Sequence, residues 1–160
     1  MNTPIVNRDL NEQAPHSPHD RFGGYVILGR TVDKCRASLT GKLGEYHFDC
    51  PLDNQLFSFK GINGMQFKSA VRSAKSYEDV AAWLENNGAR KSREEIRAWS
   101  DKMDQLRAKD VSSMKDPEHR KGLDESCEKL GLDSETVTLF DWLDSDDVES
   151  FQRETHFADR

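Results

Sequence analysis

The sequence predicts an all-α protein, a single irregular bundle of about six to eight short helices. Apolar residues recur at steps of three and four along most of the chain, and glycine or proline residues separate these stretches. No stretch alternates between apolar and polar side chains as a half-buried strand would. With 160 residues, 35% of them hydrophobic, the chain has the length of one average domain with a real core.

The first predicted helix carries a continuous apolar stripe and ends at Gly41. The stripe consists of Tyr25, Leu28, Val32, Cys35 and Leu39. Val26 and Ile27 lie outside it, so we expect the start of this helix to be covered on more than one side. The next segment, 41–55, holds two glycines and a proline and is typical of an irregular connection that runs into the following helix.

Further helices are predicted by apolar spacing together with capping and stop residues, over 52–59, 67–74, 76–86, 92–106 and 117–130. The best marked of them begins with a capping box, Ser92 with Glu95 three residues later. Residues between Ala108 and Asp116 are poor in apolar side chains and are predicted as a loop. The last apolar group, 137–151, predicts one more helix, with or without a break near Ser145.

The two ends of the chain differ from its middle. Residues 1–20 hold three prolines among polar residues and are predicted as a flexible N-terminal arm, which leaves 21–160 as a single helical domain. Residues 22–72 carry seven basic and four acidic residues, a net charge of +3, whereas 123–160 carry three basic and twelve acidic residues, a net charge of −9. The C-terminal end is therefore strongly acidic.

Composition excludes several function classes. The net charge of −6 argues against a nucleic-acid partner. The longest apolar run has five residues, far fewer than the roughly 20 that span a membrane, and the N-terminus lacks a secretory pattern, so we expect a cytoplasmic protein without a membrane partner. Three cysteines match no disulfide or zinc pattern, and nucleotide-binding and hydrolase motifs are missing, so neither cofactor nor metal is expected.

Charged residues follow the first helix away from its apolar stripe: Arg30, Asp33, Lys34 and Arg36. At this spacing they form either a ladder of surface ion pairs, each worth about 0.2–0.5 kcal/mol, or the wall of a recess. In the second interpretation the three cations receive an anionic group, and Asp33 orients the arginines.

The connection after this helix holds the other candidate residues: Glu45, Tyr46, His47, Cys50 and Asp53. Their spacing matches no metal-ligand pattern. Cys50 is either a nucleophile activated by the start of the next helix or an inert buried side chain. Asp53 is expected to be a helix cap or a carboxylate in the first turn of that helix rather than a catalytic acid.

A series of short motifs links these two stretches to a known family. They are GGY from Gly23, R-x-x-D-K-x-R-A from Arg30, G-x-x-G-E-Y from Gly41, C-P-x-D from Cys50, F-x-G-I from Phe59 and E-I-x-A-W from Glu95. Over about 20–151 the chain resembles a bacterial family known as domain of unknown function 5069. The resemblance implies family membership and no particular reaction, and it draws attention to the same helix and loop.

We expect a cytoplasmic binding or interaction module with a pocket for a small anionic ligand or an acidic partner segment. The first alternative is an enzyme that uses Cys50, His47 or Asp33 in acid/base or nucleophilic chemistry. The second is a structural partner in a larger assembly, docked through its acidic C-terminal helix. The sequence does not indicate the oligomeric state.

Overall fold

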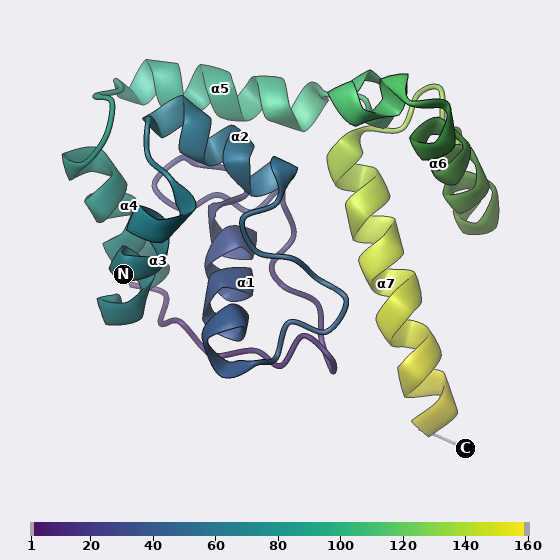
Figure 1. Ribbon diagram of the computed structural model, residues 1–160, viewed down its shortest axis with the longest axis horizontal. Helices are drawn as coiled ribbons and strands as arrows, with labels where there is room; N and C mark the ends of the chain where they lie inside the picture. The colour runs from purple at the N-terminus through teal and green to yellow at the C-terminus, as the bar shows by residue number, and fades with distance from the viewer. Residues whose placement is uncertain (1, 159–160) are drawn as a thin grey trace. The chain divides into compact units, whose positions relative to one another are not determined.

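The computed structural model describes residues 2–158 and confirms the all-α prediction (Figure 1). Its α-helices within that range are α1 (Leu28–Thr40), α2 (Pro51–Lys60), α3 (Gly64–Ser73), α4 (Tyr77–Asn86), α5 (Arg93–Gln105), α6 (Pro117–Leu130) and α7 (Leu139–Ala158). Two 3-10 turns, η1 (Ala108–Asp110) and η2 (Ser112–Lys115), occupy the stretch predicted as a loop. Strand pairing in the described range is limited to isolated bridges.

The chain divides into two compact units, residues 1–100 and 101–160. Unit 1 contains α1 to α4 and the part of α5 up to Ser100, and unit 2 contains the rest. The expectation of one domain over 21–160 concerns cooperative folding, which this division does not test, so it stays a prediction.

Helix α1 forms the centre of unit 1 and packs against α3 and α4 (Figure 1). The residues at its start, Tyr25, Val26, Ile27 and Leu28, are all 0% exposed, which confirms that this end is covered on more than one side. Other helices contribute Leu56, Phe57, Phe67, Val71, Val80 and Leu84 to the same core. The charged side chains of α1 therefore start from the most enclosed helix of the unit.

The first helix begins at Leu28 rather than at Tyr25 because Ile27 takes a left-handed backbone conformation, with φ of 74°. This conformation is unfavourable for a β-branched residue. It is held by the Ile27 N–H, which donates to the Pro18 carbonyl at 3.0 Å, and by burial of the side chain. Gly29 lies inside the helix because a Cβ there would come within 2.6 Å of the Phe22 ring.

The N-terminal segment lies against unit 1, with Leu10, Pro15 and Pro18 buried. The Leu10 N–H donates to the Lys42 carbonyl at 2.9 Å, and a Cβ at Gly44 would lie 2.7 Å from the Leu10 carbonyl oxygen. The segment is thus fastened to the connection after α1. These contacts do not measure how much the arm moves, so its predicted flexibility stays a prediction.

Unit 2 has a small core of its own. It is formed by Ala108, Leu123 and Cys127, with Met114, Leu132, Val137 and Trp142 packed against them. Helix α7 runs from Leu139 to Ala158 without a break at Ser145. None of the described helices is long and apolar enough to cross a membrane.

Two glycines of the connection after α1 provide a test of the docked N-terminal segment. Both have positive φ, but the space around Gly41 is open within 4 Å, whereas Gly44 faces the Leu10 backbone. Gly41→Ala should cost about 1 kcal/mol, from the left-handed backbone alone. Gly44→Ala should cost about 2–4 kcal/mol because crowding is added to that strain. Urea unfolding measures both values, and equal losses would contradict a close approach of Leu10 to Gly44.

Candidate functional site

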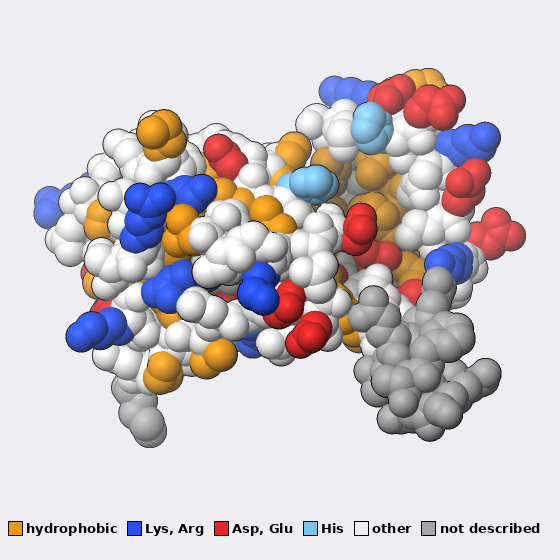
Figure 2. Space-filling view, turned by 60° about the horizontal axis from the view of Figure 1, so that its bottom comes forward, with side chains coloured by type: hydrophobic (Ala, Val, Ile, Leu, Met, Phe, Trp, Pro, Cys, Tyr) orange, Lys and Arg blue, Asp and Glu red, His pale blue; other side chains and the backbone are white. Residues whose placement is uncertain are grey.

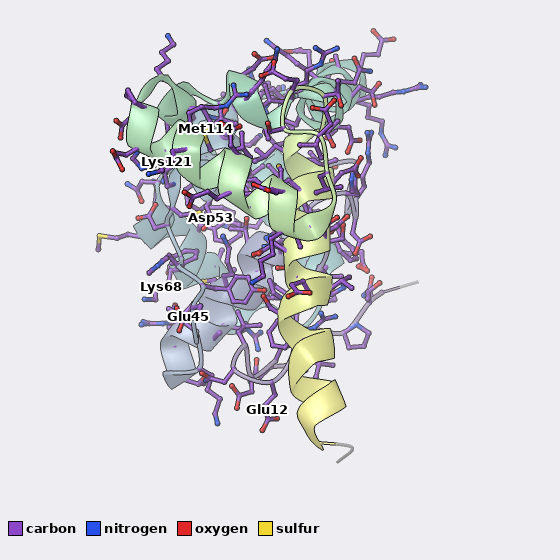
Figure 3. All side chains as sticks on the ribbon, turned by 90° about the vertical axis from the view of Figure 1, so that its right-hand side faces the viewer. Glu12, Glu45, Asp53, Lys68, Met114 and Lys121 are labelled. Atoms are coloured by element: carbon purple, nitrogen blue, oxygen red, sulfur yellow. The ribbon has the colours of Figure 1, made fainter. Side chains whose placement is uncertain are left out.

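The predicted site residues separate into buried and exposed groups. Arg30, Asp33 and Lys34 are 4%, 0% and 3% exposed, so the interpretation of these α1 charges as a surface ladder is wrong. Asp53 is also fully buried, whereas Glu45 and His47 are exposed and form no hydrogen bond or ion pair with any residue that the structure describes. Asp53 and Glu45 are both labelled in Figure 3. The nine residues therefore differ widely in exposure, and the pocket predicted from them stays a prediction.

The Asp33 carboxylate is the centre of the first buried cluster. Its Oδ2 accepts hydrogen bonds from the His16 backbone N–H at 2.8 Å and from the His16 ring Nδ1 at 2.6 Å. Its Oδ1 accepts the hydroxyl of Tyr77, and Arg8 Nε lies 3.6 Å from Oδ2. Asp33 thus joins the N-terminal segment to α1 and α4.

The second buried cluster contains Lys34, Cys50 and Asp53. Lys34 Nζ lies 2.9 Å from Asp53 Oδ1 and donates to Cys50 Sγ at 3.3 Å. Asp53 also accepts the Thr31 hydroxyl at 2.9 Å and the Asp49 backbone N–H at 2.9 Å, together with the N–H of Cys50 at 3.4 Å. The expectation that Asp53 is a cap or a first-turn carboxylate of the helix after Pro51 is confirmed, since Asp53 lies in the first turn of α2.

The two arginines of α1 contact protein groups. Arg36 Nε donates to the Val71 carbonyl at 3.2 Å, and its terminal nitrogens donate to the Ala74 carbonyl and to the Asn7 side chain, so it fastens the end of α3. The Arg30 guanidinium lies 5.4 Å from the centre of the Tyr46 ring and donates to the His16 carbonyl. Both arginines are therefore engaged within the fold.

Sequence reasoning missed His16, Tyr77 and Arg8 as partners of Asp33. His16 and Arg8 lie in the proline-containing segment predicted as a flexible arm. Nothing in the sequence distinguishes Tyr77 from the other aromatic residues of the predicted helices. A usable signal was present in the aliphatic residues Ile5 and Leu10, which a detached arm has no reason to carry and which are packed in the structure.

The pair of His16 and Asp33 has the orientation of a general base, since a buried carboxylate fixes one ring nitrogen. The other nitrogen, Nε2, forms no hydrogen bond to any described residue, and the ring is packed edge-on against Phe22 and Tyr77 at 5.5 and 4.9 Å. No hydrogen bond among the described residues joins this ring to a serine, threonine or cysteine side chain. We interpret the pair as an anchor for the N-terminal segment.

None of the residues predicted as a site lines the groove found on unit 1, although Arg36 contacts the backbone of Ala74, which does. The groove measures about 740 Å³ between α3 and α4 and is lined by Met65, Gln66, Ser69, Ala70, Ser73, Ala74, Asp79, Trp83 and Asn87. Met65 is 83% exposed, and Trp83 is half-buried against the core. The Asp79 carboxylate in the groove is occupied by the backbone N–H groups of Lys75 and Ser76, which lower its pKa.

The family of this chain follows from a comparison with family models. The model described as Domain of unknown function (DUF5069) matches residues 12–149. The chain belongs to this family. The match begins at residue 12 rather than at residue 20, so it includes His16, the residue that the docked segment brings to Asp33. No curated protein matches the sequence.

The hydrogen bond from Tyr77 to Asp33 can be measured against a matched tyrosine. Tyr25 is also buried, but its hydroxyl has no hydrogen-bond partner among the described residues. Tyr77→Phe should lower the free energy of unfolding by about 1.5–3 kcal/mol, since the bond is made to a charged group. Tyr25→Phe should leave it unchanged or raise it by about 1 kcal/mol, because an unpaired buried hydroxyl is removed. Urea unfolding at neutral pH gives both values, and the reverse order would contradict the assigned network.

Both tyrosines also make stability depend on alkaline pH. Burial raises the pKa of Tyr25 to about 12, and burial together with the hydrogen bond to Asp33 raises the pKa of Tyr77. Above about pH 10 the unfolded chain releases these protons while the folded chain keeps them, so stability is lost as the pH rises toward the folded values. Tyr77→Phe should lose less stability than the wild type between about pH 9 and pH 11. Parallel losses in unfolding experiments would contradict a raised pKa for Tyr77.

Proposed function

We propose that unit 1 is an interaction module whose groove between α3 and α4 binds an acidic, amphipathic segment of a partner protein. The observation that supports this proposal is the combination of an exposed apolar lining with a basic flank. Of the two ligand classes expected from the sequence, a small anion and an acidic partner segment, the groove favours the second. The cations expected to hold a small anion are instead engaged with Asp53, backbone carbonyls and other protein groups.

The basic flank comes from the helical geometry of α3. Arg72 follows Ser69 by three positions, and residues at this spacing are neighbours on a helix surface. Lys68 follows Met65 at the same spacing, but its Nζ lies over the Phe48 ring, 5.9 Å from the ring centre, and Phe48 does not line the groove. Lys75 follows Ala74 at the end of the groove. Figure 2 shows Lys and Arg side chains among hydrophobic ones on one face of unit 1.

Helix α4 adds one acidic residue, Asp79, to the lining of the groove. Its exposed face toward the groove carries Asp79, Trp83 and Asn87, whereas Glu78 and Glu85 lie on another side of the helix by their spacing. Asp79 is the one acidic residue among those that line the groove, and it caps the backbone. An occupant with acidic residues along one edge and a bulky apolar residue toward Met65 and Trp83 fits this surface.

The test uses two synthetic helical peptides with the same apolar face, one with Glu and one with Lys on the polar face. Isotope-labelled full-length protein should show NMR shifts around Met65 and Trp83 with the Glu peptide and none with the Lys peptide. Arg72→Glu, at an exposed position, should weaken binding about tenfold, or about 1.4 kcal/mol, by charge repulsion. Arg97→Glu, exposed on α5 and outside the groove lining, is the control of equal charge and should have little effect.

Equal binding of both peptides, failure of the Glu peptide to bind, or equal effects of the two substitutions would contradict the proposal. Addition of salt provides an independent measure, because binding guided by exposed charges weakens as screening increases.

A further inference from the structure

Cys50 differs from the two other cysteines in its surroundings. Cys35 is 0% exposed and Cys127 is 1% exposed, and burial raises the pKa of Cys35 to about 12 and raises that of Cys127 as well. Cys50, the residue that precedes α2, is partly exposed. The burial expected for an inert Cys50 is therefore wrong, and Cys50 is the least buried of the three cysteines.

This thiol has a fixed cationic partner. Lys34 is 3% exposed, and its Nζ lies 3.3 Å from Cys50 Sγ. The ammonium cannot easily move away, because Asp53, which is fully buried and held by Thr31 and two backbone N–H groups, lies 2.9 Å from it. A cation beside the sulfur of a partly exposed cysteine is the arrangement of oxidation-sensitive cysteines. Once deprotonated, the same Lys34 nitrogen is a nucleophile 3.3 Å from that sulfur.

We propose that Lys34 and Cys50 form a peroxide-responsive pair, in which oxidised Cys50 is captured by the Lys34 amine as a sulfenamide crosslink. The substrate class is a small hydroperoxide, such as hydrogen peroxide. The crosslink would join the middle of α1 to the residue that precedes α2. Because Nζ and Sγ already lie within hydrogen-bonding distance, bond formation needs no rearrangement of either helix.

The first step oxidises the thiol. The Cys50 sulfur attacks one peroxide oxygen and the O–O bond breaks, so sulfur loses two electrons to the peroxide. The second oxygen leaves as water with the thiol proton, and the product is a sulfenic acid. The peroxide is the oxidant and supplies the oxygen of the sulfenic acid.

The second step forms the crosslink. The ammonium of Lys34 first transfers one proton to Asp53 Oδ1, 2.9 Å away, which frees the lone pair of Nζ. The neutral amine then attacks the sulfenic sulfur, the S–O bond breaks and an S–N bond forms, in the way that a sulfenic acid condenses with a backbone nitrogen. The nitrogen loses one further proton, which leaves with the hydroxyl group as water. Thiols would reverse the reaction by attack on the S–N bond.

The test treats the folded full-length protein with hydrogen peroxide and maps its peptides by mass spectrometry. We expect a crosslinked pair, containing Lys34 and Cys50, that is two hydrogen atoms lighter than the separate peptides and disappears after reduction with dithiothreitol. Cys35 and Cys127 should stay unmodified. Trypsin should fail to cleave after Lys34 in the crosslinked form, because the modified amine is no longer recognised.

Two variants separate the steps. Lys34→Arg keeps a cation beside Asp53 but removes the amine, so the crosslink should be lost and trapping of Cys50 sulfenic acid by dimedone should increase. Cys50→Ser, at a half-buried position, should abolish both products. The proposal is overturned if wild-type Cys50 is oxidised no faster than Cys35 and Cys127, if it proceeds to sulfinic acid without a crosslink, or if Lys34→Arg gives the same crosslinked mass. If Lys34→Arg fails to fold, the peptide map of the peroxide-treated wild-type protein alone tests the proposal.

Discussion

The burial of the Asp33 carboxylate is the constraint on which unit 1 depends. A carboxylate removed from water is costly unless hydrogen bonds and charges replace its hydration. Here they come from His16 and Arg8 in the N-terminal segment and from Tyr77 at the start of α4, so one side chain of α1 fixes two other parts of the unit. The residues before α1 are therefore needed to pair a buried carboxylate, and they do more than cover the surface of the unit.

A second carboxylate, Asp53, has the same role on the other side of α1. It holds Lys34 and Thr31 of α1 and the backbone that leads into α2. Breaking a buried ion pair by removal of one partner is expensive, about 3–5 kcal/mol. This explains why a stretch dense in charged residues can be structural. The charges that suggest ligand binding in the sequence are largely used to join segments, and the surface that we propose for a partner is instead the groove between α3 and α4.

The sequence predicted several features that depend on residues close together in the chain. The capping box of Ser92 and Glu95 is present, with the Glu95 N–H donating to Ser92 Oγ at 3.1 Å, and Gly41, Gly61 and Gly131 end their helices as expected. The burial of Asp33 and Lys34 was not predictable in this way. Their partners lie in segments without helical periodicity or far along the chain, and no spacing rule connects residue 33 with residues 8, 16 and 77. The left-handed backbone conformation of Ile27 was not predictable for the same reason, since the Pro18 carbonyl that accepts its N–H belongs to another segment.

The network around Asp33 also bears on the order of assembly. Helix α1 can form from its own residues. It cannot be covered by α4 until His16 and Arg8 of the N-terminal segment are in place beside Asp33, because a carboxylate without these partners would otherwise be enclosed. During synthesis the N-terminal segment emerges before α1, so His16 is available when the helix appears. Tyr77 arrives later and completes the carboxylate shell as α4 closes over it. Synthesis from the N-terminus thus supplies the hydrogen-bond donors in the order in which the buried Asp33 carboxylate needs them.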